Sequence, residues 1–119
     1  MSKPKEEKPL NIVIVSSEAV PYAKTGGLAD VAGSLPMALA EAGHKVTLFI
    51  PLYKSVDRKA HSIKSVGKSV LIPVSARIEK GALYSASAAR FKTYFIENEG
   101  YFGRDQLYNS DKGDYPDNI

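Results

Sequence analysis

The chain has 119 residues, of which 44% are hydrophobic and 24% charged, and its formal net charge is +3 at pH 7. This length supports one domain that buries roughly two thirds of its unfolded surface. The absence of cysteine excludes disulfides, thiol catalysis and thiolate metal sites. Lysines and arginines are scattered without an aromatic-rich basic motif, so we expect no nucleic-acid partner.

The first residues of the chain are charged rather than apolar. Met1 to Lys8 contains three lysines and two glutamates, which is neither a signal peptide nor a membrane span. We therefore expect a disordered tail over residues 1–9, no membrane association and a cytoplasmic protein.

The segments that follow predict a β-strand, an α-helix and a second β-strand. Residues 11–15 are mostly β-branched and apolar, which is typical of a strand buried on both faces. Apolar residues recur at helical spacing over residues 28–42, and Gly43 stands where a helix typically ends. Residues 45–50 predict the second strand. Such a βαβ unit indicates an α/β fold with a parallel-rich sheet.

Proline modifies two of the predicted elements. Pro36 falls within the helical pattern and predicts a kink or a restart, with Ser34 as the cap of the second part. Pro73 falls within an alternating apolar pattern that begins at Ser69, and it indicates an edge strand or a bulge.

The second half of the chain predicts a hairpin and one more strand. Residues 51–68 are polar and lysine-rich, which indicates a surface connection. The alternating pattern that starts at residue 69 predicts a strand, residues 79–81 a turn, and residues 82–88 the returning strand. Residues 91–96 predict a further strand.

The loop between the first strand and the helix carries Lys-Thr-Gly-Gly at residues 24–27. In parallel α/β sheets such a loop lies over the carboxyl ends of the strands, where ligands bind. Glycines at a helix N-terminus expose backbone N–H groups that favour an anion, and Lys24 adds a positive charge. The pattern predicts a site for a phosphorylated ligand. A tight turn without a ligand, beside a solvated lysine, is the structural alternative.

Two common phosphate motifs are excluded by their spacing. A dinucleotide-binding fingerprint needs G-x-G-x-x-G and an acidic residue after the second strand, but residues 51–53 read Pro-Leu-Tyr there. A P-loop needs its lysine after the glycines, whereas Lys24 precedes them.

The loop sequence resembles a known family. Residues 16–31 fit the pattern S-S-E-x-x-P-x-x-K-x-G-G-L-A-D-V, which is similar to the opening of the bacterial glycogen synthases and plant starch synthases that use ADP-glucose. The likeness continues in N-E-G-Y-F-G-R-D-Q-L-Y at residues 98–108 and in D-Y-P-D-N at residues 114–118. It covers almost the whole chain after residue 10.

The resemblance implies a retaining glucosyltransferase of glycosyltransferase family 5, with the two-domain GT-B architecture. Such an enzyme transfers glucose from ADP-glucose to the non-reducing end of an α-1,4-glucan such as glycogen or starch. Residues 10–119 would be the N-terminal Rossmann-like catalytic domain, truncated at its C-terminal end. The family's catalytic residues would lie beyond residue 119, so we assign none here and expect the fragment alone to be inactive.

The resemblance also implies roles for individual residues in binding ADP-glucose. Lys24 would contact the donor, and Gly26 and Gly27 would offer backbone N–H groups to its diphosphate. Asp30 would order the loop or contact the donor sugar, although an acid there also complements the helix dipole. Three further residues are expected to position the loop: Glu18, Tyr22 and Thr25.

Two alternatives remain open from the residues alone. The first is a GT-B transferase that uses another nucleotide sugar, such as UDP-glucose, because the loop contacts phosphates and the base is chosen elsewhere. The second is a non-catalytic glucan-binding or phosphate-binding module. No carboxylate or histidine cluster has metal-ligand spacing, so we expect neither a metal nor a cofactor.

Overall fold

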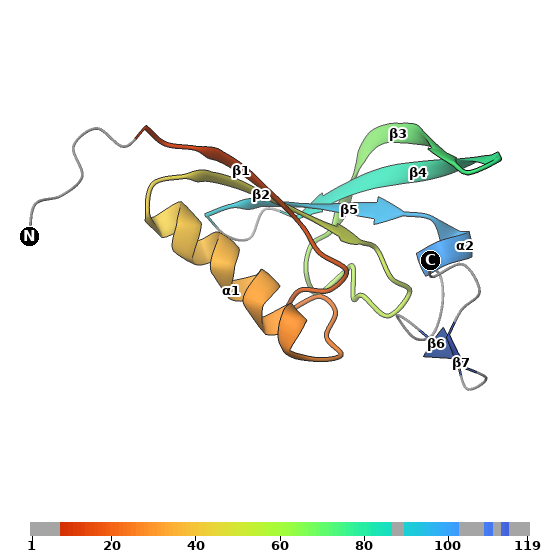
Figure 1. Cartoon of the computed structure of the whole chain (residues 1–119), viewed down its shortest axis with the longest axis horizontal. Helices are drawn as coiled ribbons and strands as arrows, with labels where there is room; N and C mark the ends of the chain where they lie inside the picture. Colours follow the sequence, from red (N-terminus) through yellow and green to blue (C-terminus); the bar gives the residue numbers. More distant parts are fainter. Residues whose placement is uncertain (1–7, 87–89, 103–108, 111–112, 115–119) are drawn as a thin grey trace, which may run out of the picture.

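The structure is a computed structural model that describes residues 8–86, 90–102, 109–110 and 113–114. Its centre is a five-stranded sheet in the order β1-β2-β5-β4-β3, and helix α1 lies along one face (Figure 1). The bounds of the elements are β1 Asn11–Val15, α1 Gly27–Glu41, β2 Lys45–Pro51, β3 Lys64–Val74, β4 Arg77–Ala86, β5 Lys92–Glu97, α2 Glu99–Phe102, β6 Asn109–Ser110 and β7 Gly113–Asp114.

The predicted βαβ unit is confirmed. β1 pairs in parallel with β2, from Asn11 with Lys45 to Val15 with Phe49, and α1 connects the two strands. β2 pairs in parallel with β5 on its other side, so it is the central strand of the parallel part. β4 and β3 complete the sheet in antiparallel orientation. The α/β class is therefore confirmed, with a sheet that is mixed.

The core lies between α1, the sheet and the connection that follows β2. The three alternate residues of β2 that face α1 are buried, and Phe95 of β5 is fully enclosed beside them. The prediction that β1 is buried on both faces is wrong. Val13 is 63% and Val15 78% exposed, because β1 is an edge strand whose outer face is not covered within the described residues.

Helix α1 is continuous through Pro36, so the predicted kink or restart is wrong. Ser34 does not cap a second helix; its hydroxyl donates to the carbonyl of Asp30 at 2.9 Å. The buried face of α1 consists of small residues and the proline ring, which let the helix approach its neighbours closely. These residues are Ala29, Ala32 and Pro36.

The connection between β2 and β3 is more buried than its polar composition predicts. Arg58 donates to the Glu97 carboxylate of β5 at 2.5 Å, and this hydrogen bond raises the pKa of Arg58 above its ordinary value. The ion pair ties the connection to the sheet. Four apolar side chains of the connection enter the core: Leu52, Tyr53, Val56 and Ile63.

The turn predicted at residues 79–81 is wrong, because the β3–β4 hairpin turns earlier. Val74 pairs with Arg77, and Ser75 between them has a φ of 56°. Gly81 lies inside β4, where an added Cβ would stand 3.1 Å from the side chain of Ile96. The glycine therefore marks close packing on the sheet rather than a turn. Pro73 does lie in an edge strand, as predicted.

Candidate functional site

The loop of residues 16–26 runs from the end of β1 to the start of α1 (Figure 1). It therefore lies at the carboxyl ends of the parallel strands, the position at which open α/β sheets bind ligands. Its first amide, that of Ser16, donates to the carbonyl of Phe49 in β2 at 3.0 Å. The amide of Val20 donates to the carbonyl of Ala29 in α1, also at 3.0 Å. The loop is thus hydrogen-bonded to the sheet and to the helix.

The Glu18 side chain organises the second half of this loop. It is only 2% exposed, and its carboxylate accepts hydrogen bonds from three groups among the described residues. One comes from the Thr25 hydroxyl at 2.5 Å, and the other two from the backbone amides of Gly26 and Ala29 at 3.2 Å each. Ala29 is the third residue of α1, and the backbone amide at this position usually donates to the side chain of the N-cap residue. Glu18 supplies that acceptor in place of Gly26, which has no side chain.

Aromatic contacts hold the base of the loop against the core. The Tyr22 ring packs edge-on against Phe95 and His61, with ring centroids 4.9 Å apart in both pairs. The Tyr53 hydroxyl donates to the carbonyl of Ser17 at 2.6 Å. Sequence reasoning missed Tyr53 and His61, because both belong to the connection that was expected on the surface.

Lys24 and Asp30 form the exposed part of the site. The Lys24 ammonium donates to both oxygens of the Asp30 carboxylate, at 2.8 and 3.0 Å. Both side chains are about half exposed, at 52% and 57%. The pair links the loop to the first turn of α1 and keeps the ammonium beside the helix N-terminus.

Gly26 and Gly27 have open space where a side chain would stand. An added Cβ at either position meets nothing within 4 Å, and the φ of Gly26, −166°, is extended backbone that any residue adopts. Neither packing nor conformation within the described residues requires glycine at these positions. Gly33 is the opposite case, because a Cβ there would lie 2.8 Å from the carbonyl oxygen of Val20.

The N-terminal amides of α1 divide into two sets. Those of Gly26 and Ala29 donate to Glu18, so the Gly26 amide is already engaged. Within the described part of the chain, the amides of Gly27 and Leu28 have no acceptor. These two amides belong to the first turn of the helix, where intrahelical partners are lacking. The amides available to an anion are therefore those of Gly27 and Leu28.

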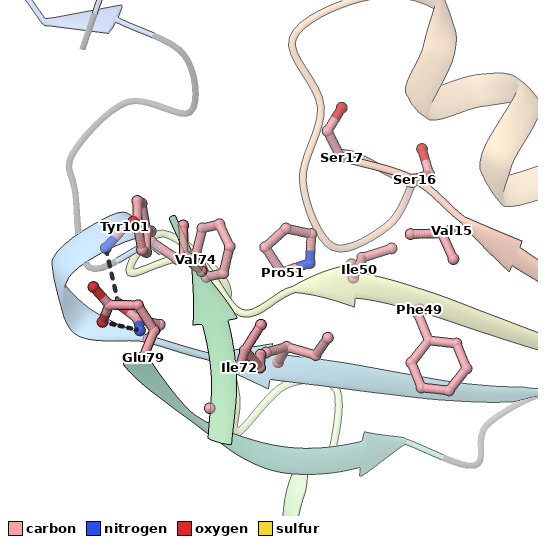
Figure 2. Close-up of a pocket in the computed structure, with 14 residues that line it drawn as sticks. Val15, Ser16, Ser17, Phe49, Ile50, Pro51, Ile72, Val74, Glu79 and Tyr101 are labelled. Carbon is pink, nitrogen blue, oxygen red and sulfur yellow. Dashed lines mark hydrogen bonds between the residues drawn. The ribbon is translucent and has the colours of Figure 1, made fainter. Parts of the chain in front are cut away.

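A pocket of about 500 Å³ lies on the sheet face opposite α1, away from the Lys-Thr-Gly-Gly part of the loop (Figure 2). Its walls are mostly apolar, with Phe49, Ile72 and Val74 among them. Ser16 and Ser17 reach its rim, but neither Lys24 nor the two glycines line it. Apolar walls of this kind suit a packing surface rather than recognition of a phosphate.

Comparison with known proteins identifies the family. Residues 11–119 match the sequence model of a protein family that is described as the starch synthase catalytic domain. This chain belongs to the starch synthase catalytic domain family. The resemblance in the loop sequence and in residues 98–118 is confirmed by this match.

Individual relatives support the same assignment. The glycogen synthase of Syntrophotalea carbinolica is 43% identical over 109 residues, which cover 92% of this chain and 22% of that protein. The glycogen synthase of Elusimicrobium minutum is 46% identical over 110 residues, with 92% and 23% covered. This member of the starch synthase family thus spans about a fifth of the length of the curated relatives it matches.

A solved structure supports the fold. The catalytic domain of starch synthase IV from Arabidopsis thaliana, bound to ADP and acarbose, superposes with a TM-score of 0.78 and 26% identity. The match covers 88% of this chain and 22% of that chain. The mixed sheet described above is therefore the arrangement found in the starch synthase catalytic domain.

No helix in the described ranges is long and apolar enough to cross a bilayer. The same residues contain no group of three or more histidine, aspartate or glutamate side chains placed to hold a metal ion. The expected disordered tail falls largely on residues 1–7, which lie outside the described residues.

Proposed function

We propose that this chain is the N-terminal part of a cytoplasmic glycogen or starch synthase. The complete enzyme transfers glucose from ADP-glucose to the non-reducing end of an α-1,4-glucan, with retention of configuration. Support comes from the family match over residues 11–119 and from the relative whose structure holds ADP and acarbose. Residues 10–119 would form the N-terminal Rossmann-like domain, truncated at its C-terminal end.

Lys24 and the first turn of α1 are proposed to bind the donor diphosphate. The observation that carries this proposal is the open space at Gly26 and Gly27, beside the ammonium of Lys24. Glycine at a helix start has a cost in backbone entropy, and the described fold does not require it there. A diphosphate approaching the Gly27 amide would need that space and would bring a charge that Lys24 complements.

The chemistry of glucosyl transfer suits this arrangement. As the bond between glucose and the diphosphate breaks, negative charge builds on the departing ADP. An ammonium and fixed backbone amides aimed at that charge are stronger in the transition state than in the ground state. Lys24 would exchange its Asp30 partner for a phosphate oxygen, and Asp30 would then remain in the first helical turn to order the loop or contact the sugar.

Glu18, Thr25 and Tyr22 are proposed to position the loop. The Glu18 carboxylate accepts from the Gly26 amide, and the Thr25 hydroxyl donates to the same carboxylate. The Tyr22 ring packs against Phe95 and so anchors the loop on the core. No catalytic residue is assigned within residues 1–119. Transfer therefore requires the remainder of the enzyme, and the 119-residue chain alone is expected to be inactive because one half of the cleft cannot orient both substrates.

UDP-glucose remains the alternative donor, because this loop contacts phosphates and not the base. The ADP in the Arabidopsis relative favours ADP-glucose. Initial rates of the full-length enzyme with both nucleotide sugars, at one glycogen concentration, decide between them. A kcat/KM that is higher for UDP-glucose would overturn the proposed donor.

Gly27→Val in the full-length enzyme is expected to lower kcat/KM for ADP-glucose by at least about tenfold, because the added side chain occupies the space proposed for the diphosphate. Stability should change by no more than about 1 kcal/mol, the scale of helix-propensity differences. Steady-state kinetics and urea denaturation measure the two effects. Ala38→Val adds a β-branched residue at an exposed position of the same helix and is the matched control. A Gly27→Val enzyme that unfolds while its folded fraction uses donor normally would make Gly27 purely structural.

A further inference from the structure

Glu18 is a buried anion that already occupies part of the α1 N-terminus. Its carboxylate is enclosed and accepts from one hydroxyl and two backbone amides. Hydrogen bonds donated to a carboxylate favour its ionised form over its neutral form. The Glu18 carboxylate therefore lies directly behind the donor site proposed above.

The Glu18 carboxylate and the proposed diphosphate use neighbouring amides of the same helical turn. Gly26 and Ala29 donate to Glu18, while the intervening Gly27 and Leu28 have no acceptor within the described residues. An anion on the intervening amides would therefore lie next to the Glu18 carboxylate. Two like charges at such close range repel each other, even where one of them is partly exposed to solvent.

We propose that Glu18 limits the affinity of the site for ADP. Its hydrogen bonds hold the loop in shape, and its charge opposes the diphosphate, so that the product is bound weakly enough to leave. Glu18 is then a positioning residue with a second, electrostatic role. The proposal rests on the proposed function, because it requires the diphosphate to bind at Lys24 and Gly27.

Glutamine at position 18 separates the two roles of Glu18. The side-chain oxygen of glutamine can still accept from the amides of Gly26 and Ala29, which both donate to the same oxygen of Glu18. Its NH₂ group can donate to the Thr25 hydroxyl, reversing the direction of that hydrogen bond. Glu18→Gln therefore keeps the shape of the loop and removes the charge. Glu18→Ala removes both.

The experiment is calorimetric titration of the full-length enzyme with ADP, AMP and adenosine. For Glu18→Gln we expect a Kd for ADP at least about fivefold lower than that of the parent, a smaller decrease for AMP and none for adenosine. Glu18→Ala is expected to bind ADP more weakly than the parent, because the loop amides lose their acceptor. Glu41→Gln removes one charge from the exposed C-terminal end of α1 and should leave every Kd within about twofold.

The possible outcomes separate this proposal from the proposed function. If Lys24→Ala weakens ADP binding but Glu18→Gln leaves the Kd for ADP unchanged or higher, the donor site stands and the role of the Glu18 charge is wrong. An equal gain in affinity for all three ligands would also overturn it, since the effect would not follow ligand charge. A Glu18→Gln enzyme that does not fold would overturn it too, because the charge would then be needed for the loop itself. Should Lys24→Ala leave the Kd for ADP unchanged, the proposed function fails first.

Discussion

Replacing Lys24 with alanine in the full-length enzyme is expected to lower kcat/KM for ADP-glucose by a factor equivalent to about 2–4 kcal/mol. The substitution removes the positive side-chain charge that Lys24 offers to the diphosphate in the proposed site. Because charge on that group grows as the glucosyl bond breaks, the effect should fall on kcat as well as on KM. Steady-state kinetics with varied ADP-glucose and saturating glycogen measure both parameters.

Folding should be almost unaffected by the loss of Lys24. Its ion pair with Asp30 is half exposed on both sides, and such pairs contribute no more than about 1 kcal/mol. Lys45→Ala is the matched control, because Lys45 is an exposed lysine at the opposite end of the parallel strands. Equal kinetic constants for Lys24→Ala and the parent would remove Lys24 from the donor site.

The second large effect is expected on stability, from Gly33→Ala. The new Cβ would stand 2.8 Å from the Val20 carbonyl oxygen and would also overlap the Val20 side chain. The side chain can rotate away, but the carbonyl belongs to a backbone that is hydrogen-bonded to Ala29 of the same helix. The loop and α1 must therefore separate, which we expect to destabilise the domain by about 1–3 kcal/mol. Urea denaturation of the full-length enzyme, followed by circular dichroism, measures the change.

Gly26→Ala is the matched control for Gly33→Ala. The substitution is chemically identical, and the position is open with an ordinary backbone conformation. We expect a change within about 0.5 kcal/mol, as for other substitutions in open surroundings. Equal destabilisation by the two substitutions would contradict the close contact between α1 and the loop.

The βαβ unit could be predicted because its signals are local. The β-branched run at residues 11–15, the helical spacing after it and Gly43 at the helix end each act within a few residues. The place of the Lys-Thr-Gly-Gly loop between β1 and α1 could be predicted in the same way, whereas its binding of phosphate stays a prediction. The turn at Ser75 was not predicted from the sequence, because Gly81 was interpreted as a turn residue. In the structure Gly81 instead allows close packing across the sheet.

The internal support of the loop depends on contacts that sequence spacing does not reveal. Glu18 accepts from amides eight and eleven residues away, and only the folded loop brings them together. For the same reason the sequence could not indicate that the Gly26 amide is engaged while that of Gly27 remains available. Tyr53 lies 36 residues from Ser17, to which it donates a hydrogen bond. Because its segment is polar in composition, the sequence did not indicate that Tyr53 is buried in the core.

The most direct test of the donor site is a crystal structure of the full-length enzyme with ADP. We expect the Lys24 ammonium and the Gly27 amide each to lie about 3 Å from oxygens of the diphosphate. Glu18 should retain its hydrogen bonds from the amides of Gly26 and Ala29. A diphosphate bound away from this loop, with Lys24 still paired to Asp30, would contradict the proposed donor site.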